Sequence, residues 1–246
     1  MGKIFLIGGG EIAPLETLKL DRKAVKLTGK KKPKALFIPT ASGEPQGYVD
    51  VFNKVYGKKL GCKIDVLYCL KGKPSKKKLR KQILSADLIY VGGGNTLKMM
   101  NRWRFLGVDK MLKEAYRKGI VLTGLSAGGM CWFESGHSDS RSFKDSKDWK
   151  YIKVSGLGLL KGIHCPHFDS ATKGKKRKTC FKEFMKKYSS IGIAIDNNCA
   201  IEFIDGKYKL LRSVKTANAY RVFRVKGKVQ LELIPEKGLV KDLYVK

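Results

Sequence analysis

The chain has 246 residues, 43% of them hydrophobic, which suits a folded domain with a sizeable core and excludes a disordered polypeptide. The formal net charge is +31, but lysine supplies most of it along the whole chain, so we expect a lysine-rich surface and no specific nucleic-acid partner. No apolar run approaches the ~18 residues of a membrane span, and the amino-terminal run is too short for a signal peptide, so we expect a cytoplasmic protein without a membrane partner.

The first half of the chain alternates short apolar runs with amphipathic stretches. The runs predicted to form buried strands lie at residues 3–7, 35–39, 64–68, 87–91 and 120–122. Helical periodicity is found at residues 48–59, 75–84, 97–100 and 108–118. This alternation predicts an α/β fold with a mostly parallel, doubly wound sheet, in which functional sites lie at the carboxyl ends of strands.

Beyond residue 133 the chain is predicted to continue the same domain, and its carboxyl-terminal third is predicted to be mostly antiparallel β structure. Residues 134–153 are polar and are expected to form a surface loop. Further strands are predicted at residues 156–163 and 191–195, with a helix around residues 181–185 between them. Hairpin turns are expected at Asp205-Gly206 and Lys226-Gly227. With no linker and no internal repeat, we predict one domain over residues 1–246, completed by carboxyl-terminal antiparallel hairpins.

A strand, a Gly-rich turn and a helix follow one another at residues 119–133. The turn contains the pattern G-x-S-x-G centred on Ser126, which also occurs in ordinary Gly-rich turns. In a nucleophile elbow, this turn exposes the serine hydroxyl at the tip of the strand, and the flanking glycines relieve crowding. The amide of Ala127 would then face a developing oxyanion. We therefore interpret Ser126 as a candidate nucleophile.

Two other Gly-rich loops follow predicted strands. Residues 8–10 lack the G-x-G-x-x-G spacing, which makes a dinucleotide site improbable. Residues 92–94 can bring bare backbone amides to a strand end beside Ser126. The six cysteines include no C-x-x-C pair, so we expect reduced thiols and no metal site. The sequence implies no cofactor.

A serine nucleophile needs a base, and the chain has three histidines, at positions 137, 164 and 167. His167 is favoured because Pro166 fixes the backbone beside it, directly after a predicted strand.

The base also needs a group that orients it. The candidates are Asp196, at the end of a strand, and Asp139, in the loop after the serine, with Asp169 and Glu134 as weaker alternatives. We favour Asp196, because a strand end holds an imidazole better than a loop does.

Four segments together resemble the successive motifs of the S51 serine peptidases, a family that includes peptidase E, an aspartyl dipeptidase, and the cyanophycinases. The segments are residues 92–96 (G-G-G-N-T), 124–128 (G-L-S-A-G), 165–168 (C-P-H-F) and 192–196 (G-I-A-I-D). The resemblance covers roughly residues 1–235. It implies a three-layer α/β sandwich like that of the class I glutamine amidotransferases, with a serine in place of their cysteine.

By this resemblance, Ser126 matches the nucleophile and His167 the base, which gives a Ser126–His167–Asp196 triad with Asp139 as the alternative acid. The amides of Gly93 and Ala127 match the oxyanion-hole donors.

Other positions match the substrate-binding part of the family's site. Arg177 resembles a basic position that faces a substrate aspartate, and Gly94 and Asn95 are expected to contact substrate. His164 and Gly129 depart from the peptidase E pattern, which leaves the substrate side chain open.

The resulting hypothesis is a serine hydrolase, peptidase E-like, that cleaves small peptides, with N-terminal aspartyl peptides as candidate substrates. Its partner would be a small peptide, and the protein would be a monomer or a homodimer. Two alternatives remain: a hydrolase of β-linked aspartyl polymers of the cyanophycin type, and a non-catalytic protein that binds nucleic acid through its basic surface.

Overall fold

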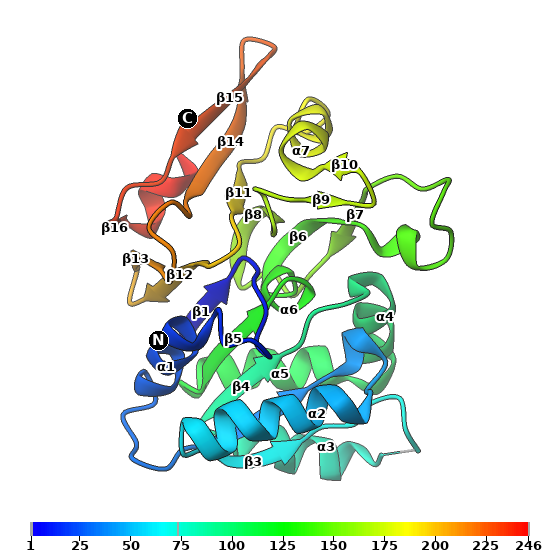
Figure 1. The fold of residues 1–246 in the computed structure, drawn as a ribbon, viewed down its shortest axis with the longest axis vertical. Helices are drawn as coiled ribbons and strands as arrows, with labels where there is room; N and C mark the ends of the chain where they lie inside the picture. Colours follow the sequence, from blue (N-terminus) through cyan, green and yellow to red (C-terminus); the bar gives the residue numbers. More distant parts are fainter. Residues whose placement is uncertain (1, 73, 246) are drawn as a thin grey trace.

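The larger of two β-sheets contains the strands predicted in the first half of the chain. A computed structural model describes residues 2–72 and 74–245 (Figure 1). The strands of this sheet follow the order β16-β13-β12-β1-β5-β4-β2-β3. Its parallel part consists of β1 (Lys3–Ile7), β5 (Val121–Leu125), β4 (Leu88–Val91), β2 (Lys34–Ile38) and β3 (Lys63–Val66). The predicted mostly parallel arrangement is confirmed for this part.

Helices cover both faces of the parallel strands, because successive strand residues point to opposite sides. On one face Phe5 and Ile7 pack in the same cluster as the helices α1 (Leu18–Lys26) and α2 (Gln46–Phe52), the latter continued by a π-helix (Asn53–Lys59). On the other face Ile4 and Leu6 share a cluster with three further helices. These are α3 (Lys76–Leu84), α4 (Thr96–Leu106) and α5 (Val108–Arg117).

The smaller sheet follows the order β15-β14-β11-β8-β6-β7 and belongs to the second half of the chain. Its central strands, β6 (Phe133–Ser138), β8 (Leu160–Cys165) and β11 (Gly192–Ile195), are parallel. The outer strands are antiparallel: β7 (Ile152–Ser155), β14 (Ala219–Val225) and β15 (Lys228–Leu233). A short hairpin of β9 (Ala171–Thr172) and β10 (Lys175–Lys176) precedes α7 (Arg177–Met185), which packs on this sheet.

The carboxyl-terminal strands are divided between the two sheets. Strands β12 (Cys199–Ile204), β13 (Lys207–Arg212) and β16 (Lys237–Leu239) extend the larger sheet in antiparallel order beside β1. Short 3-10 helices lie at Thr40–Ser42, Ser140–Phe143 and Val240–Tyr244. The two predicted hairpins are confirmed as β12–β13 and β14–β15. Among the described residues, no helix is both long and apolar enough to cross a lipid bilayer.

Three expectations about the fold were incomplete or wrong, two of them in the second half of the chain. Residues 134–153 do not form one surface loop, because the first of them belong to β6 and the last to β7. The residues of β6 from Ser135 to Ser138 are small or polar, yet they are buried, so hydrophobicity gave no signal. The strands after Ser126 therefore form a second sheet instead of only closing the first. Helix α1 was not predicted either, since charged residues separate its apolar positions.

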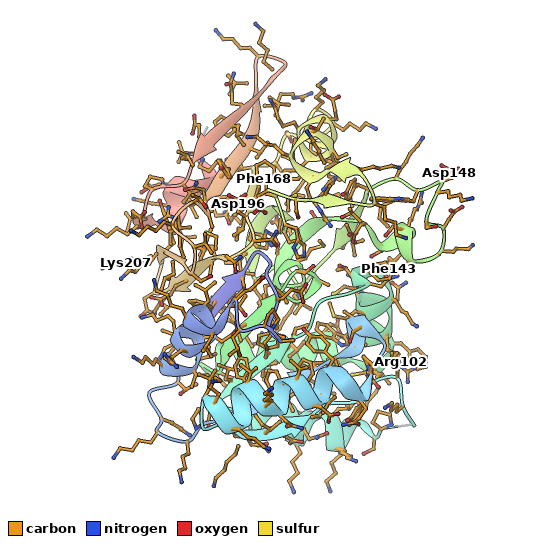
Figure 2. All side chains as sticks on the ribbon, viewed as in Figure 1. Arg102, Phe143, Asp148, Phe168, Asp196 and Lys207 are labelled. Carbon is orange, nitrogen blue, oxygen red and sulfur yellow. The ribbon has the colours of Figure 1, made fainter. Side chains whose placement is uncertain are left out.

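Positive charge is distributed over the surface. Figure 2 shows long side chains that end in nitrogen projecting from the molecule on all sides of the view. A specific nucleic-acid site would need them gathered on one face or along one groove. In this view the basic side chains are thus not confined to one element or one edge of the molecule.

The turn after β5 is fixed by direct backbone contacts between glycines and the neighbouring strand. A Cβ atom on Gly124 would lie 2.5 Å from the carbonyl oxygen of Gly128, and one on Gly128 would overlap the carbonyl oxygen of Val91 in β4. Only residues without a side chain allow β4, β5 and the following helix to approach this closely. The two glycines that flank Ser126 are thus required by packing.

We expect Gly128→Ala to lower the free energy of unfolding by roughly 1–3 kcal/mol, because the added methyl group must displace the backbone of β4. Chemical denaturation followed by circular dichroism measures this. Gly47→Ala is the matched control: Gly47 lies exposed in α2 with no atom within 4 Å of an added Cβ. Its stability should stay the same or rise by up to about 1 kcal/mol. Equal stability of the two variants would contradict the packing argument.

Candidate functional site

Ser126 lies between β5 and the one-turn helix α6 (Ala127–Met130) in a strained backbone conformation, with φ 56° and ψ −113°. Non-glycine residues adopt such angles rarely, and they do so mostly where function requires it. The side chain is half-buried. The bare backbone of Gly93 lies against it, since a Cβ there would be 3.4 Å from Ser126 Cβ. The serine and the 92–94 loop are thus neighbours, as the sequence predicted.

His167 lies at the same end of the strands as Ser126. It follows β8 by two residues, and its backbone amide donates a hydrogen bond to the Gly8 carbonyl (3.0 Å), directly after β1. Since Ile7 of β1 pairs with Leu125 of β5, Gly8 and Ser126 come one residue after the same rung of the sheet. The hydrogen bonds of the described residues include none between Ser126 Oγ and His167, and such pairs are often loose without substrate.

The imidazole of His167 is oriented by Asn197. Its Nδ1 lies 2.7 Å from Asn197 Oδ1. An amide oxygen only accepts hydrogen bonds, so Nδ1 carries the proton and Nε2 of the neutral ring is left with a free lone pair. This is the tautomer that a general base needs. The Asn197 backbone amide in turn donates to Asp169 Oδ1 (2.9 Å).

Neither aspartate proposed as the orienting acid contacts His167. The carboxylate of Asp196 accepts a hydrogen bond from the Asn218 backbone amide (2.9 Å), and its pKa is raised to about 6, mainly by burial. Asp139 is paired with Arg177. In the structure the residue that contacts the imidazole is Asn197, the neighbour of the predicted Asp196. Asn197 lies in the turn after β11, and this turn places its side chain against the histidine while Asp196 contacts Asn218.

The glycines after β1 complete the support of the histidine. A Cβ atom on Gly9 would overlap both Asn197 Oδ1 and His167 Nδ1. The Gly9 carbonyl also accepts a hydrogen bond from the Asn198 amide (3.0 Å). Sequence reasoning considered residues 8–10 only as a phosphate loop and so missed this role. The signal was the three-glycine run itself, which indicated that some group approaches the backbone closely.

The charge environment keeps His167 neutral near pH 7. Burial lowers the pKa of His167 below its ordinary value of 6.5, and the Arg177 guanidinium lowers it further. The hydrogen bond from Nδ1 to Asn197 and the carboxylates of Asp139 and Asp169 oppose these effects only in part. A neutral imidazole is the form that can accept the proton of a serine hydroxyl.

Arg177 does not face an open site. It is 2% exposed, and its Nη2 lies 2.6 Å from Asp139 Oδ2 and 2.9 Å from Thr172 Oγ1. Its Nη1 donates to the His137 carbonyl (3.3 Å). The expectation that Arg177 receives a substrate aspartate is therefore not supported, because its charge is already paired within the protein.

Asn95 and Gly94 have structural roles as well. Asn95 caps α4: its Oδ1 accepts from the Lys98 amide (3.0 Å), and its Nδ2 donates to the Ser140 carbonyl (3.1 Å). Gly94 has φ 134°, and a Cβ there would overlap the Ala41 carbonyl oxygen. These contacts fix the loop that holds Gly93, so neither residue is free in the way the sequence analysis expected.

Tyr48 is a neighbour of this loop that the sequence analysis did not identify. A Cβ atom on Gly92 would lie 2.9 Å from its ring, and its pKa is raised to about 12 by burial, against the effect of a hydrogen bond from the Gly93 backbone. The Gly93 backbone therefore lies close to the Tyr48 hydroxyl.

The other two histidines are buried structural residues. His164 donates from Nδ1 to the Ile193 carbonyl (2.9 Å) and stacks on Phe133, and burial lowers its pKa to about 4. A Cβ on Gly129 would lie 3.5 Å from His164 Nε2. His164 and Gly129, the two positions that depart from the peptidase E pattern, are therefore neighbours in the core.

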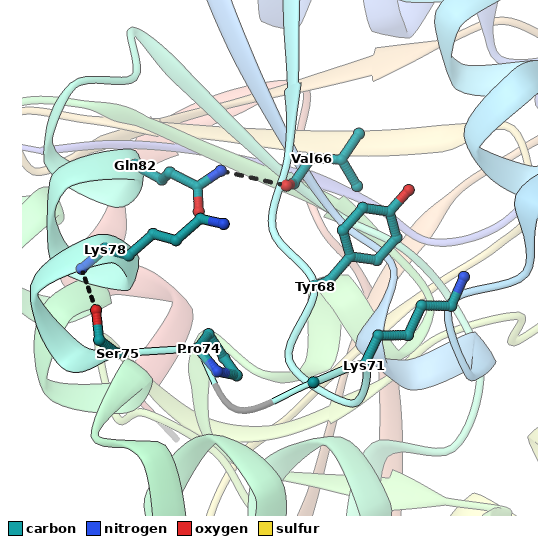
Figure 3. Close-up of a pocket in the computed structure, with 8 residues that line it drawn as sticks. Val66, Tyr68, Lys71, Pro74, Ser75, Lys78 and Gln82 are labelled. Carbon is teal, nitrogen blue, oxygen red and sulfur yellow. Dashed lines mark hydrogen bonds between the residues drawn. The ribbon is translucent and has the colours of Figure 1, made fainter.

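A hollow of about 570 Å³ lies away from these groups, beside β3 and the start of α3 (Figure 3). It is lined by Val66, Tyr68, Lys71, Gly72, Pro74, Ser75, Lys78 and Gln82. None of these carries a nucleophile–base pair, and the hydrogen bonds drawn there hold the α3 terminus and the β3 end. In the described ranges, no three His, Cys, Asp or Glu side chains gather in a way that could hold a metal ion.

Comparison with known proteins supports the relationship that the motifs indicated. The sequence profile of peptidase family S51 matches residues 4–211. The chain is 33% identical over 242 residues to an uncharacterized peptidase, YgaJ, of Bacillus subtilis, and the match covers 97% of this chain and 100% of the other.

Two solved structures share the fold. One is a peptidase from an acI-B1 Actinobacterium (TM-score 0.73, 19% identity, 97% of each chain). The other is a putative peptidase E protein from Listeria monocytogenes EGD-e (TM-score 0.64, 22% identity, 86% of this chain and 98% of the other). Given the profile match over most of its length and its identity to YgaJ, the chain belongs to peptidase family S51, a family of serine-type peptidases.

Proposed function

We propose that the protein hydrolyses small peptides through Ser126, His167 and Asn197. The observation that carries this proposal is the 2.7 Å contact between His167 Nδ1 and Asn197 Oδ1, which leaves Nε2 as a base on the side away from Asn197. An asparagine orients the catalytic histidine in the same way in papain-like proteases. Family membership supports a serine nucleophile, and Ser126 lies in the strained turn that such nucleophiles occupy.

The reaction then follows from these groups. His167 Nε2 takes the proton of Ser126 as the hydroxyl attacks the peptide carbonyl, and it returns that proton to the leaving amine. Water, activated by the same imidazole, hydrolyses the acyl-enzyme. The Ala127 amide begins a helix and has no carbonyl one turn before it, so it can donate to the oxyanion. Gly93, whose bare backbone lies against Ser126, is the second donor.

Dipeptides are the substrates that we propose, and N-terminal aspartate is not required. The motif resemblance supports a peptidase E-like activity, but the paired state of Arg177 removes the cation that an aspartyl side chain would need. Hydrolysis of β-linked aspartyl peptides is the alternative within the same chemistry. A panel of α-linked dipeptides and β-Asp-Arg, scored for release of the second residue, separates the two.

Ser126→Ala is expected to reduce kcat by at least about 1,000-fold, since the acyl-enzyme can no longer form. Hydrolysis of the most active dipeptide measures the loss, and the thermal midpoint should stay near that of the wild type. A fluorophosphonate probe should label the wild-type protein at Ser126 and leave the variant unlabelled. Undiminished turnover by the variant would exclude Ser126 as the nucleophile.

Asn197→Ala is expected to lower kcat by up to about 100-fold with little change in KM, because the imidazole loses the contact that fixes its orientation. Asn197→Asp keeps an acceptor for Nδ1–H and should retain much more activity. Asp196→Asn is the control, and it should leave kcat within a few-fold of wild type, because Asp196 contacts Asn218 instead. The opposite ranking of the Asn197→Ala and Asp196→Asn variants would restore the original triad.

The pH profile tests the protonation state of His167. Because burial and Arg177 lower the pKa of His167, the neutral base persists to below pH 6.5, and kcat/KM should fall only at lower pH. Asn197→Asp places a negative charge beside Nδ1–H, which stabilises the imidazolium and moves this acid limb to higher pH. An acid limb above pH 6.5 in the wild type, or a shift to lower pH in the variant, would contradict the assignment.

A further inference from the structure

Asp139 lies at the edge of the smaller sheet beside the proposed base. Strands β6 and β8 are parallel neighbours, with Gly136 opposite His164. Strand β6 ends at Ser138 and β8 at Cys165, so Asp139 and His167 both follow at the carboxyl ends of adjacent strands. The Asp139 carboxylate also acts electrostatically on His167. Asp139 therefore belongs to the same edge as the reacting groups, although it does not orient the histidine.

The segment that carries Asp139 is also tied to the loop beside Ser126. Ser140 Oγ accepts a hydrogen bond from the Leu97 amide (3.0 Å), and the Ser140 carbonyl accepts from Asn95 Nδ2 (3.1 Å). Asn95 and Leu97 follow directly after the 92–94 glycines. Asp139 is thus held between the base on one side and the proposed oxyanion loop on the other.

In the ion pair between Asp139 and Arg177, the solvent reaches the aspartate and hardly reaches the arginine. The Arg177 side chain is 3% exposed, whereas that of Asp139 is 20% exposed. Asp139 Oδ2 accepts from Arg177 Nη2 (2.6 Å) and from Thr172 Oγ1 (3.2 Å). The hydrogen bonds found among the described residues involve Oδ2 and not Oδ1, and the side chain is partly exposed. One carboxylate oxygen is therefore fixed and the other is available to a ligand.

Other acidic side chains near His167 are less suited to receive a ligand. Asp196 accepts from the Asn218 amide and Asp169 from the Asn197 amide, and both contacts support the backbone. Glu11 lies in the loop after β1. It is exposed, and its backbone amide donates a hydrogen bond to the Glu16 carboxylate. Among the described residues, Asp139 is the one of these four that an ion pair anchors, and part of its side chain remains exposed.

We propose that Asp139 binds the α-ammonium group of the substrate, so that the enzyme cleaves peptides at a free amino terminus. This inference rests on the proposed function. The α-nitrogen of an amino-terminal residue is two bonds from the scissile carbonyl carbon, so a carboxylate beside the base reaches the ammonium when Ser126 reaches the carbonyl. A charge-assisted hydrogen bond to a fixed carboxylate would orient that residue.

The same ion pair explains how the site would choose between an amino terminus and an acidic side chain. Arg177 lies on the buried side of its partner. Its Nη1 and Nη2 donate to the His137 carbonyl, Asp139 and Thr172, and its Nε is buried without a partner. The exposed group is therefore an anion. Such a site favours a cation and disfavours a carboxylate, which makes recognition depend on the backbone amine more than on the first side chain.

The experiment compares dipeptides Xaa-Leu with their N-acetyl forms, which lack the ammonium charge. The wild type should hydrolyse the free peptides roughly 10- to 100-fold more efficiently, the range expected for one hydrogen bond to a charged group. Asp139→Asn should lose that factor in kcat/KM on the free peptides and keep its activity on the acetylated ones. Glu11→Gln should preserve the wild-type ratio.

The remaining outcomes each contradict the proposed ammonium site in a different way. Equal cleavage of free and acetylated peptides by the wild type overturns the proposal, whether or not the variant folds. An equal loss on both substrates in Asp139→Asn assigns Asp139 a structural role through Arg177, and loss of discrimination in Glu11→Gln moves the ammonium site to Glu11. No hydrolysis of any peptide by the wild type would instead defeat the proposed function itself.

Discussion

The site depends on one close approach between backbone and side chains, at Gly9. Because Gly9 has no side chain, the loop after β1 can lie directly on the His167–Asn197 pair, which belongs to the other sheet. Hydrogen bonds from the His167 amide to Gly8 and from the Asn198 amide to Gly9 join the same segments. The nucleophile on one sheet and the base on the other are therefore held by backbone contacts that tolerate little displacement. A side chain at this point would separate the two halves of the site.

The pairing of Arg177 and the pKa of His167 both depend on how deeply these groups are buried. Arg177 is buried and would be costly without a partner, so Asp139 is held against it. His167 lies near both, and burial together with the cation outweighs the anion, so its pKa falls. The imidazole is a weaker base than in water, but it is present in the reactive form across the neutral range. Orientation is supplied by a neutral amide, which adds no charge to this balance.

The parallel part of the larger sheet and the turn at Ser126 were readable from the sequence because their signals are local. The apolar runs that became β1, β2 and β4 and the turn at Ser126 needed no knowledge of distant contacts. The orienting residue did not have such a signal. Asp196 and Asn197 are adjacent, and only the direction of the chain after β11 decides which one meets His167.

The smaller sheet was the main part of the fold that the sequence did not reveal. Strand β6 was hidden because small and polar residues can occupy a buried strand when neighbouring strands satisfy their backbone. The sequence did not show that Gly9 belongs to the site, because the side chains against which it packs lie more than 150 residues away in the chain. Arg177 matched a motif, yet the ion pair that neutralises it depends on Asp139, which follows β6 in a distant part of the chain.

The division of the proposed catalytic groups between two sheets has a consequence for how the protein would lose activity under denaturing conditions. Ser126 is attached to the larger sheet through β5, whereas His167 and Asn197 are attached to the smaller one through β8 and β11. A small shear between the sheets would break the seam of hydrogen bonds at Gly8 and Gly9 while each sheet stayed intact. Catalytic competence would then vanish at denaturant concentrations that leave the circular dichroism spectrum unchanged, because local opening requires less free energy than global unfolding.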